Sequence, residues 1–153
     1  MPVEDFAHRL RTRRLAAGLT QRQLAEGSGV KQPLIAALER GARQPTQAVR
    51  TALDDALQVR PSDVLRVNRD RVADLVHATG ATDAWVYGSV ARGEDRPGSD
   101  VDLLVAFPPD ADIVTLLTLE DDLAHLLTVP VDVTSAGGTG RVLESARAEA
   151  VPL

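Results

Sequence analysis

The feature that most constrains this chain is a glycine-serine turn followed at a fixed spacing by acidic residues. Gly88 and Ser89 follow a short apolar run, ten residues separate them from Asp100, and Asp102 follows after one intervening residue. Side chains alternate across a β-strand, so a strand that begins at Asp100 would place Asp100 and Asp102 on one face. A second apolar run, VPVDVTS, carries Asp132. The pattern predicts three carboxylates on neighbouring strands beside a tight turn.

Carboxylates that share one face repel each other, and a divalent cation offsets that repulsion. Mg²⁺ binds few protein carboxylates and completes its shell with water and phosphate oxygens. Three converging acids can hold two such ions, one for the attacking oxygen and one for the leaving group. We therefore expect Asp100, Asp102 and Asp132 to be the metal ligands and catalytic residues.

The turn before the acids has the composition of a phosphate site. Gly88 allows close approach of a ligand, Ser89 adds a hydroxyl donor, and a helix is expected to start just after the strand Ala84–Tyr87. Arg92, one turn further on, could meet phosphate. These three residues are the phosphate-binding candidates.

Each element alone has a simpler interpretation. A Gly-Ser pair is usually just a turn, an Asp-x-Asp pair is often a solvated strand end or a structural calcium site, and one Asp in an apolar strand can be an edge residue. Their joint order and spacing favours an active site. The acid run at residues 120–122 is interpreted as a solvated helix face.

Charge divides the chain into two modules, residues 1–60 and 61–153. The first has 10 Lys+Arg and 6 Asp+Glu, and the second has 7 and 16. There are no cysteines, the N-terminus does not resemble a secretory signal, and no apolar run approaches a membrane span. We expect a cytoplasmic protein with no membrane partner, whose modules have different partners.

The first module is predicted to be a bundle of short helices. Thr20 and Gln23 form a capping-box pattern, and Lys31–Arg40 is predicted to be a further helix. Two short helices joined by a glycine-containing turn, with a basic balance, are typical of DNA-binding helix-turn-helix domains. Pro61 is expected to close this module, with the next helix at Asn68–Thr79.

The run LRTRRLAAGLTQRQLAEGSGVKQPLIAALERGARQP resembles the Xre/Cro/C1 helix-turn-helix family. The resemblance implies a pairing of Arg14 with Glu39, and a recognition helix that starts near Lys31 and enters the major groove. The DNA-contact candidates are Gln21, Lys31, Gln32 and Arg43. Apolar residues at 34, 36 and 37 stand where such domains often place polar readers, so a bundle used only for dimerisation is the alternative.

The run GSVARGEDRPGSDVDLLV, with the later Asp132, resembles the minimal nucleotidyltransferases, which have the DNA polymerase β-type fold. The fold class implied is α+β: an all-α helix-turn-helix bundle followed by a small α/β domain with a mixed sheet. By this resemblance the three acids bind Mg²⁺, and Asp132 assists deprotonation of the attacking hydroxyl. Gly88 and Ser89 would hold the β- and γ-phosphates of ATP, and Ser99 would order the loop before the acids. With Arg92, these are the nucleotide-binding candidates.

Many minimal nucleotidyltransferases are antitoxins of HEPN-domain ribonuclease toxins. The resemblance implies transfer of AMP from ATP to a tyrosine of such a toxin, and repression of the operon through operator DNA by a homodimer or a hetero-oligomer with the toxin. About twenty residues follow Asp132, so we expect a partner to complete the acceptor site. The alternatives are a transcription regulator with a non-catalytic nucleotidyltransferase domain, and a small-molecule nucleotidyltransferase of the aminoglycoside-modifying type.

Overall fold

The computed structural model describes residues 3–153, with side chains from residue 6 onward, and it divides the chain into two compact units. Residues 1–59 form the first unit and residues 60–153 the second. The predicted fold class is confirmed: the described part of the first unit is helical, and the second contains a mixed four-stranded sheet. Within residues 3–153, no helix combines the length and apolarity that crossing a bilayer requires.

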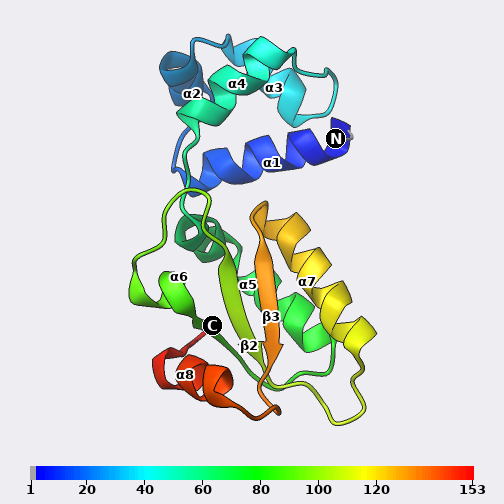
Figure 1. Cartoon of the computed structure of the whole chain (residues 1–153). Coiled ribbons are helices and arrows are strands. Elements are labelled where there is room, and N and C mark those ends of the chain that lie inside the picture. The colour runs from blue at the N-terminus through cyan, green and yellow to red at the C-terminus, as the bar shows by residue number, and fades with distance from the viewer. Residues whose placement is uncertain (1–2) are drawn as a thin grey trace. The chain divides into compact units, whose positions relative to one another are not determined.

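The first unit is built from short helices around one apolar core (Figure 1). Its helices are α1 (Val3–Ala16), α2 (Gln21–Ser28), α3 (Gln32–Glu39) and α4 (Gln47–Ala56). Leu24, Ile35 and Leu38 are fully buried at its centre. The capping box that starts α2 is confirmed, since Thr20 Oγ1 accepts from the Gln23 amide at 3.1 Å and Gln23 Oε1 accepts from the Thr20 amide at 2.9 Å.

A nearly buried ion pair joins α1 to α3. Arg14 donates through Nε to Glu39 Oε1 at 2.5 Å and through Nη2 to Glu39 Oε2 at 3.0 Å. Its remaining terminal nitrogen, Nη1, donates to the Leu19 carbonyl at 2.8 Å. The predicted pairing of Arg14 with Glu39 is confirmed. Such bidentate geometry fixes the orientation of both side chains.

The second unit alternates helices with strands (Figure 1). Its elements are α5 (Pro61–Ala78), β1 (Ala84–Tyr87), α6 (Gly88–Arg92), β2 (Val101–Val105), α7 (Ile113–Leu127), β3 (Val131–Ser135), α8 (Arg141–Glu149) and β4 (Val151–Pro152). The strand order is β3-β2-β1-β4. The β2–β3 pair is parallel, whereas β1 runs antiparallel to both β2 and β4.

The two faces of this sheet differ in what they contact. Val101, Leu103 and Val105 alternate along β2 and are completely buried, and α5 and α7 pack against each other and against the sheet. Asp102 and Leu104 occupy the opposite face of the same strand. The helices α6 and α8 contact each other beside β1 and β2. The carboxylates therefore project from the face that the α5–α7 layer leaves free.

The predicted start of a helix at Asn68 is wrong. Pro61 does not precede a separate helix at Asn68; it occupies the first turn of α5, which runs unbroken to Ala78. Proline is well tolerated at this position, because its missing amide would have no intrahelical partner and its φ already suits a helix. The proline therefore begins a helix where the sequence suggested a break.

Candidate functional site

Strand register brings the predicted acids together. Asp102 on β2 is the direct partner of Asp132 on the parallel strand β3, and Asp100 immediately precedes β2. One carboxylate oxygen from each of the three residues can be chosen so that all lie within 4.8 Å of one another. Asp100 and Asp102 are partly buried and Asp132 is exposed. The cluster therefore presents hard oxygen ligands toward one point with an open side.

The charges of this cluster oppose one another. Burial, followed by the negative charges of Asp100 and Asp132, raises the pKa of Asp102 to about 6. The pKa of Asp132 is raised as well, by burial and then by Asp100 and Glu120. Ionised carboxylates held this close favour either a proton or a cation between them. A hard divalent cation such as Mg²⁺ suits an all-oxygen ligand set, so these residues could hold a metal.

Gly88 lies against the acid cluster. Strand β1 ends at Tyr87, the register partner of Asp102, and the chain then turns into α6. A Cβ atom on Gly88 would lie 2.3 Å from Asp102 Oδ2, and the Gly88 φ of +70° is a conformation that side-chain-bearing residues rarely adopt. Only glycine fits this position without moving the carboxylate.

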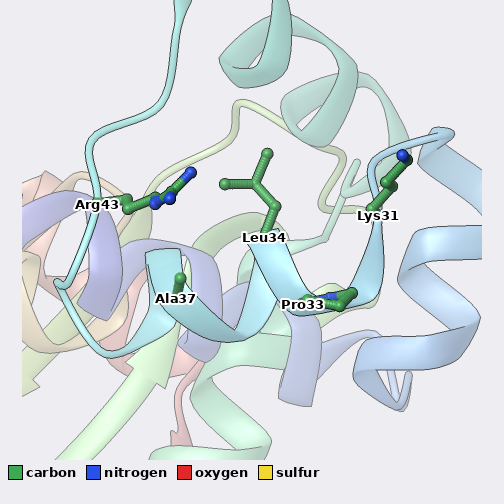
Figure 2. Close-up of a pocket in the computed structure, with 5 residues that line it drawn as sticks. All are labelled: Lys31, Pro33, Leu34, Ala37 and Arg43. Atoms are coloured by element: carbon green, nitrogen blue, oxygen red, sulfur yellow. The ribbon is translucent and has the colours of Figure 1, made fainter.

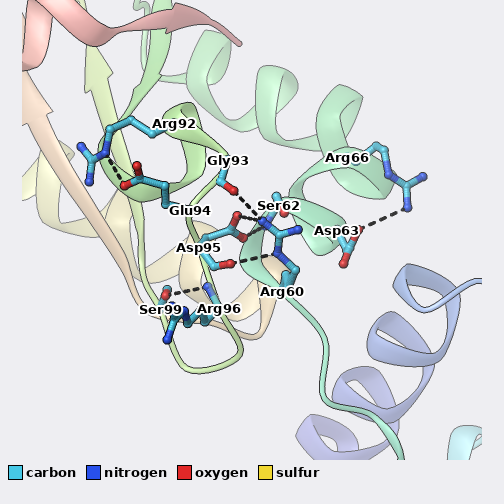
Figure 3. Close-up of polar contacts among 10 residues, drawn as sticks. All are labelled: Arg60, Ser62, Asp63, Arg66, Arg92, Gly93, Glu94, Asp95, Arg96 and Ser99. Carbon is cyan, nitrogen blue, oxygen red and sulfur yellow. Dashed lines mark hydrogen bonds and ion pairs between the residues drawn. The ribbon is translucent and has the colours of Figure 1, made fainter.

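The predicted phosphate donors hold an anion from the chain itself. The Gly88 amide donates to Glu149 Oε1 at 3.0 Å, and Arg92 Nη1 donates to Glu149 Oε2 at 2.8 Å. These hydrogen bonds, first from Arg92 and then from Gly88, lower the pKa of Glu149. Arg92 Nε also donates to Glu94 Oε2 at 2.9 Å (Figure 3). Glu149 was not predicted, and a lone glutamate 61 residues from Gly88 gives no sequence signal of this contact.

A buried aspartate fixes the loop that leads to the acids. The Asp95 side chain is fully buried, and it accepts from Arg60 Nη2 at 2.7 Å and from the Ser62 amide at 2.8 Å (Figure 3). Burial alone would raise the pKa of Asp95, but the hydrogen bonds from Ser62 and Arg60 outweigh it, so the net pKa is lowered. Ser99 Oγ accepts from the Arg96 amide at 3.0 Å in the same loop. The sequence indicated only a polar turn here.

Glu120 lies close to Asp132 of the acid cluster. Its Oε2 accepts from the amide of Val133 at 2.9 Å, next to Asp132 on the outer strand β3. The prediction that residues 120–122 form a solvated face is therefore wrong for Glu120, although Asp121 and Asp122 are exposed. An edge strand has unpaired amides, and a carboxylate from a packed helix can satisfy one of them.

A small cavity lies further along the sheet. Its volume is about 230 Å³, and its lining residues are Trp85, Leu104, Ala136, Arg147 and Ala150. Trp85 and Leu104 are register partners two residues from the pair Tyr87 and Asp102, so they share the face of the acids. The side chain of Tyr87, on β1, reaches across β2, and its hydroxyl lies 3.1 Å from Thr134 Oγ1 on β3.

The four predicted DNA contacts fall into two pairs on the first unit. Gln32 Nε2 donates to Gln21 Oε1 at 3.0 Å, and Gln21 Nε2 donates in turn to Glu39 Oε2 at 2.9 Å. Lys31 and Arg43 are exposed and line a cavity of about 450 Å³ (Figure 2). The glutamines are therefore joined to the α1–α3 ion pair, whereas the two cations border an open pocket.

Comparison with known proteins identifies the second unit. Residues 68–147, more than half of the chain, match the family model described as a nucleotidyltransferase domain. The chain belongs to the nucleotidyltransferase domain family. Residues 5–67 match a helix-turn-helix domain model, so this nucleotidyltransferase carries a helix-turn-helix domain before its nucleotidyltransferase domain.

Two curated relatives share sequence with this nucleotidyltransferase. A protein of Methanocaldococcus jannaschii, provisionally named a protein adenylyltransferase, is 31% identical over 71 residues, which cover 46% of this chain and 83% of that protein. The protein adenylyltransferase MntA of Thermococcus cleftensis is 37% identical over 59 residues, which cover 39% of this chain and 60% of that protein.

Solved structures share the fold. One provisionally described as a minimal nucleotidyltransferase has 42% identity and a TM-score of 0.54, covering 60% of this chain and 95% of that one. A toxin–antitoxin crystal structure with AMP-PNP has 20% identity and a TM-score of 0.51, covering 56% of this chain and 71% of that one. At that identity, the second likeness concerns the fold alone.

The site of this nucleotidyltransferase combines oxygen ligands for a metal with N–H donors for an anion. Asp100, Asp102 and Asp132 converge as hard oxygen ligands, and Gly88 and Arg92 supply anion donors at the adjoining turn. A triphosphate bridging the two would place its anionic oxygens between a cation site and N–H donors. This arrangement suits phosphoryl chemistry, in which positioning and charge stabilisation supply most of the catalysis.

Proposed function

We propose that this nucleotidyltransferase is the antitoxin of a toxin–antitoxin pair and transfers AMP from ATP to a tyrosine of a HEPN-domain toxin. The observation that carries the proposal is the convergence of Asp100, Asp102 and Asp132 beside the donors of Gly88 and Arg92. Relatives named protein adenylyltransferases, and the toxin–antitoxin structure with an ATP analogue, support this choice of reaction and partner.

The three aspartates are proposed to hold Mg²⁺, as two ions. Their all-oxygen chemistry and mutual repulsion favour a hard divalent cation. When bound, such ions would offset the negative charge on the phosphate oxygens of ATP and make a nearby hydroxyl more acidic. The Asp102 carboxylate lies directly against Gly88, and this contact limits its movement.

The β- and γ-phosphates are proposed to bind at the turn that follows β1. Gly88 and Arg92 already hold the Glu149 carboxylate, so their N–H groups converge on one anion. A triphosphate would take over those donors, and the Ser89 hydroxyl would add one more. Ser99 acts indirectly in this proposal, through the turn that it closes with Arg96.

The transfer step is an in-line displacement at the α-phosphorus. The tyrosine hydroxyl oxygen forms a bond to the α-phosphorus, while the bond from that phosphorus to the bridging oxygen of the β-phosphate breaks. Pyrophosphate leaves with the electron pair, and the tyrosine proton passes to Asp132.

The first unit is proposed to bind operator DNA and repress the operon that encodes the pair, as a homodimer or together with the toxin. The helix-turn-helix match and the exposed cations Lys31 and Arg43 support this role. Phosphate contacts of this kind release counterions, so affinity should fall as salt rises. If the protein binds no DNA even at low salt, the first unit serves dimerisation instead.

The decisive experiment is co-expression with the product of the neighbouring gene, followed by intact mass measurement of that product. The expected result is a mass increase by one or more adenylates, which disappears with Asp100→Ala and with Asp102→Ala. Asp121→Ala is the matched control, because Asp121 is an exposed acid on α7 outside the cluster. Protection from toxicity that persists in both cluster variants, with no added mass, would contradict the catalytic proposal and favour a binding-only regulator.

A further inference from the structure

The exposed side of α3 is apolar at its centre and cationic at its ends. The cavity of about 450 Å³ on this side is lined by Lys31, Pro33, Leu34, Ala37 and Arg43. Figure 2 shows Leu34 between the side chains of Lys31 and Arg43. Leu34 and Ala37 are only partly buried, although Leu34 also packs against the core of the unit. A helix that presents such a surface offers few hydrogen-bonding groups to a ligand there.

The nearby polar side chains are already engaged. Gln21 uses its carbonyl oxygen to accept from Gln32 and its amide nitrogen to donate to Glu39. Glu39 is held in place by the bidentate Arg14. Gln21 is therefore held at both ends of its side-chain amide, and each end keeps one further donor or acceptor. This network fixes the orientation of Gln21 beside α3.

One major-groove feature matches an apolar reader. The C5-methyl group of thymine is an apolar group that a base edge presents in this groove, and alanine-sized or aliphatic side chains contact it. Lysine and arginine at the two ends of such a surface match the phosphates that border the groove. The pocket thus places a cation, an apolar surface and a second cation in one row. A thymine-bearing duplex presents the matching groups in the same order: phosphate, methyl group, phosphate.

We infer that α3 selects its DNA site through thymine methyl groups that enter the pocket formed by Leu34 and Ala37, between phosphate contacts from Lys31 and Arg43. This inference rests on the proposed DNA binding of the first unit and specifies what the unit reads. Charge favours duplex DNA over a protein as the occupant, because residues 1–60 have 10 Lys+Arg against 6 Asp+Glu and two of those cations border the pocket.

The test removes methyl groups from DNA without changing any hydrogen-bonding group. Sites are selected from a random duplex library with the full-length protein, and each thymine of the selected site is then replaced by deoxyuridine. We expect at least one thymine in each half-site whose replacement weakens binding about fourfold, the effect of burying one methyl group. Thymines outside the α3 contact should tolerate the replacement.

Matched protein variants assign that effect to the pocket. Ala37→Gln fills the pocket with a polar side chain and should remove the preference for thymine over deoxyuridine. Ala36→Gln makes the same change one residue earlier, outside the pocket lining, and should keep the preference. Circular dichroism and thermal unfolding verify that both variants fold. Retention of the preference in Ala37→Gln would contradict the inference.

The remaining outcomes distinguish failure of thymine-methyl recognition from failure of the proposed DNA binding. If no duplex binds at low salt, the DNA-binding function itself is wrong. If DNA binds tightly but deoxyuridine is accepted at every position, DNA binding stands and methyl reading is wrong. If Ala37→Gln leaves DNA binding unchanged and weakens binding of the co-expressed toxin instead, the pocket is a protein-docking surface and the inference is also wrong.

Discussion

The Asp102 carboxylate occupies space that a side chain at position 88 would need: its Oδ2 lies 2.3 Å from the site of a Cβ on Gly88. Gly88 begins α6 directly after β1, and Asp102 lies on the adjacent strand β2, where it is paired with Tyr87. The turn that is proposed to bind phosphate and the carboxylate that is proposed to bind metal are therefore in direct contact. A change in one must move the other.

Gly88→Ala should abolish the proposed AMP transfer while the protein remains folded. The added methyl group displaces the Asp102 carboxylate, and the positive φ adds about 1 kcal/mol of strain. Gly93→Ala is the matched control, because Gly93 has the same φ of +70° and a methyl group there would meet nothing within 4 Å. Adenylation of the co-expressed partner measured by mass, together with thermal unfolding, separates the two variants. Equal loss of activity in both would show that backbone strain, not the clash, is responsible.

The stability of the metal-free second unit should fall as pH rises from about 4 to beyond 6. The pKa of Asp102 in the folded state is about 6, above its ordinary value of 3.8, so its contribution to stability is complete below 3.8 and is lost as pH rises through 6. A shift of this size corresponds to about 3 kcal/mol, and solvent screening reduces it to about 1–2 kcal/mol.

Urea unfolding followed by the fluorescence of Trp85, the single tryptophan of the chain, measures this effect in the second unit. Asp102→Asn cannot ionise, so its stability relative to the unchanged protein should increase across this pH range in the presence of a chelator. Excess Mg²⁺ at pH 7.5 should stabilise the unchanged protein and leave Asp102→Asn nearly unaffected. A pH-independent difference between the two proteins would contradict the coupling among the acids.

Glu149→Gln should tighten binding of a non-hydrolysable ATP analogue. Its carboxylate holds the Gly88 amide and Arg92, so a triphosphate must displace it before taking the same donors. Losing the charge weakens that competitor, and we expect the dissociation constant to fall several-fold. Glu94→Gln is the control, since Glu94 bonds Arg92 but not Gly88. Weaker binding in Glu149→Gln, measured by calorimetry, would instead make Glu149 a support for the turn.

Asp95→Ala should destabilise the second unit by about 2 kcal/mol. The substitution leaves the Ser62 amide and the Arg60 guanidinium without their buried acceptor. Asp63→Ala is a matched control, because the pair of Asp63 with Arg66 is exposed and 3.8 Å long, and such pairs contribute little (Figure 3). The measurement is urea unfolding followed by Trp85 fluorescence. A similar small loss in both variants would mean that Asp95 is not a structural anchor.

Sequence patterns predicted those parts of the fold that depend on local chemistry. The strand Ala84–Tyr87 and the Thr20–Gln23 capping box were predicted at the residues where they occur. Parallel pairing of β2 with β3 then places Asp132 opposite Asp102, as expected for acids on neighbouring strands. Alternation along strands and caps at helix starts act over a few residues, so the sequence alone shows them.

Long-range polar contacts were not predictable in the same way. Glu149, Asp95 and Glu120 each accept hydrogen bonds from backbone amides 61, 33 and 13 residues away. Nothing in the spacing of a lone acid indicates which distant amide it will meet. Glu120 also stands in a run of acids on a helix, a pattern that is usually solvent-exposed. Such partners are determined only when tertiary packing has brought the segments together.

Arg60 has a consequence for where the two units can be separated. It is the first residue of the second unit, and it clamps Asp95 in the loop before Asp100. A polypeptide that began at residue 68, where the nucleotidyltransferase match starts, would lose this clamp and about two turns of α5. A cut placed before Arg60 keeps both. The first unit could therefore be exchanged for another module while the contacts that order the acid cluster stay intact.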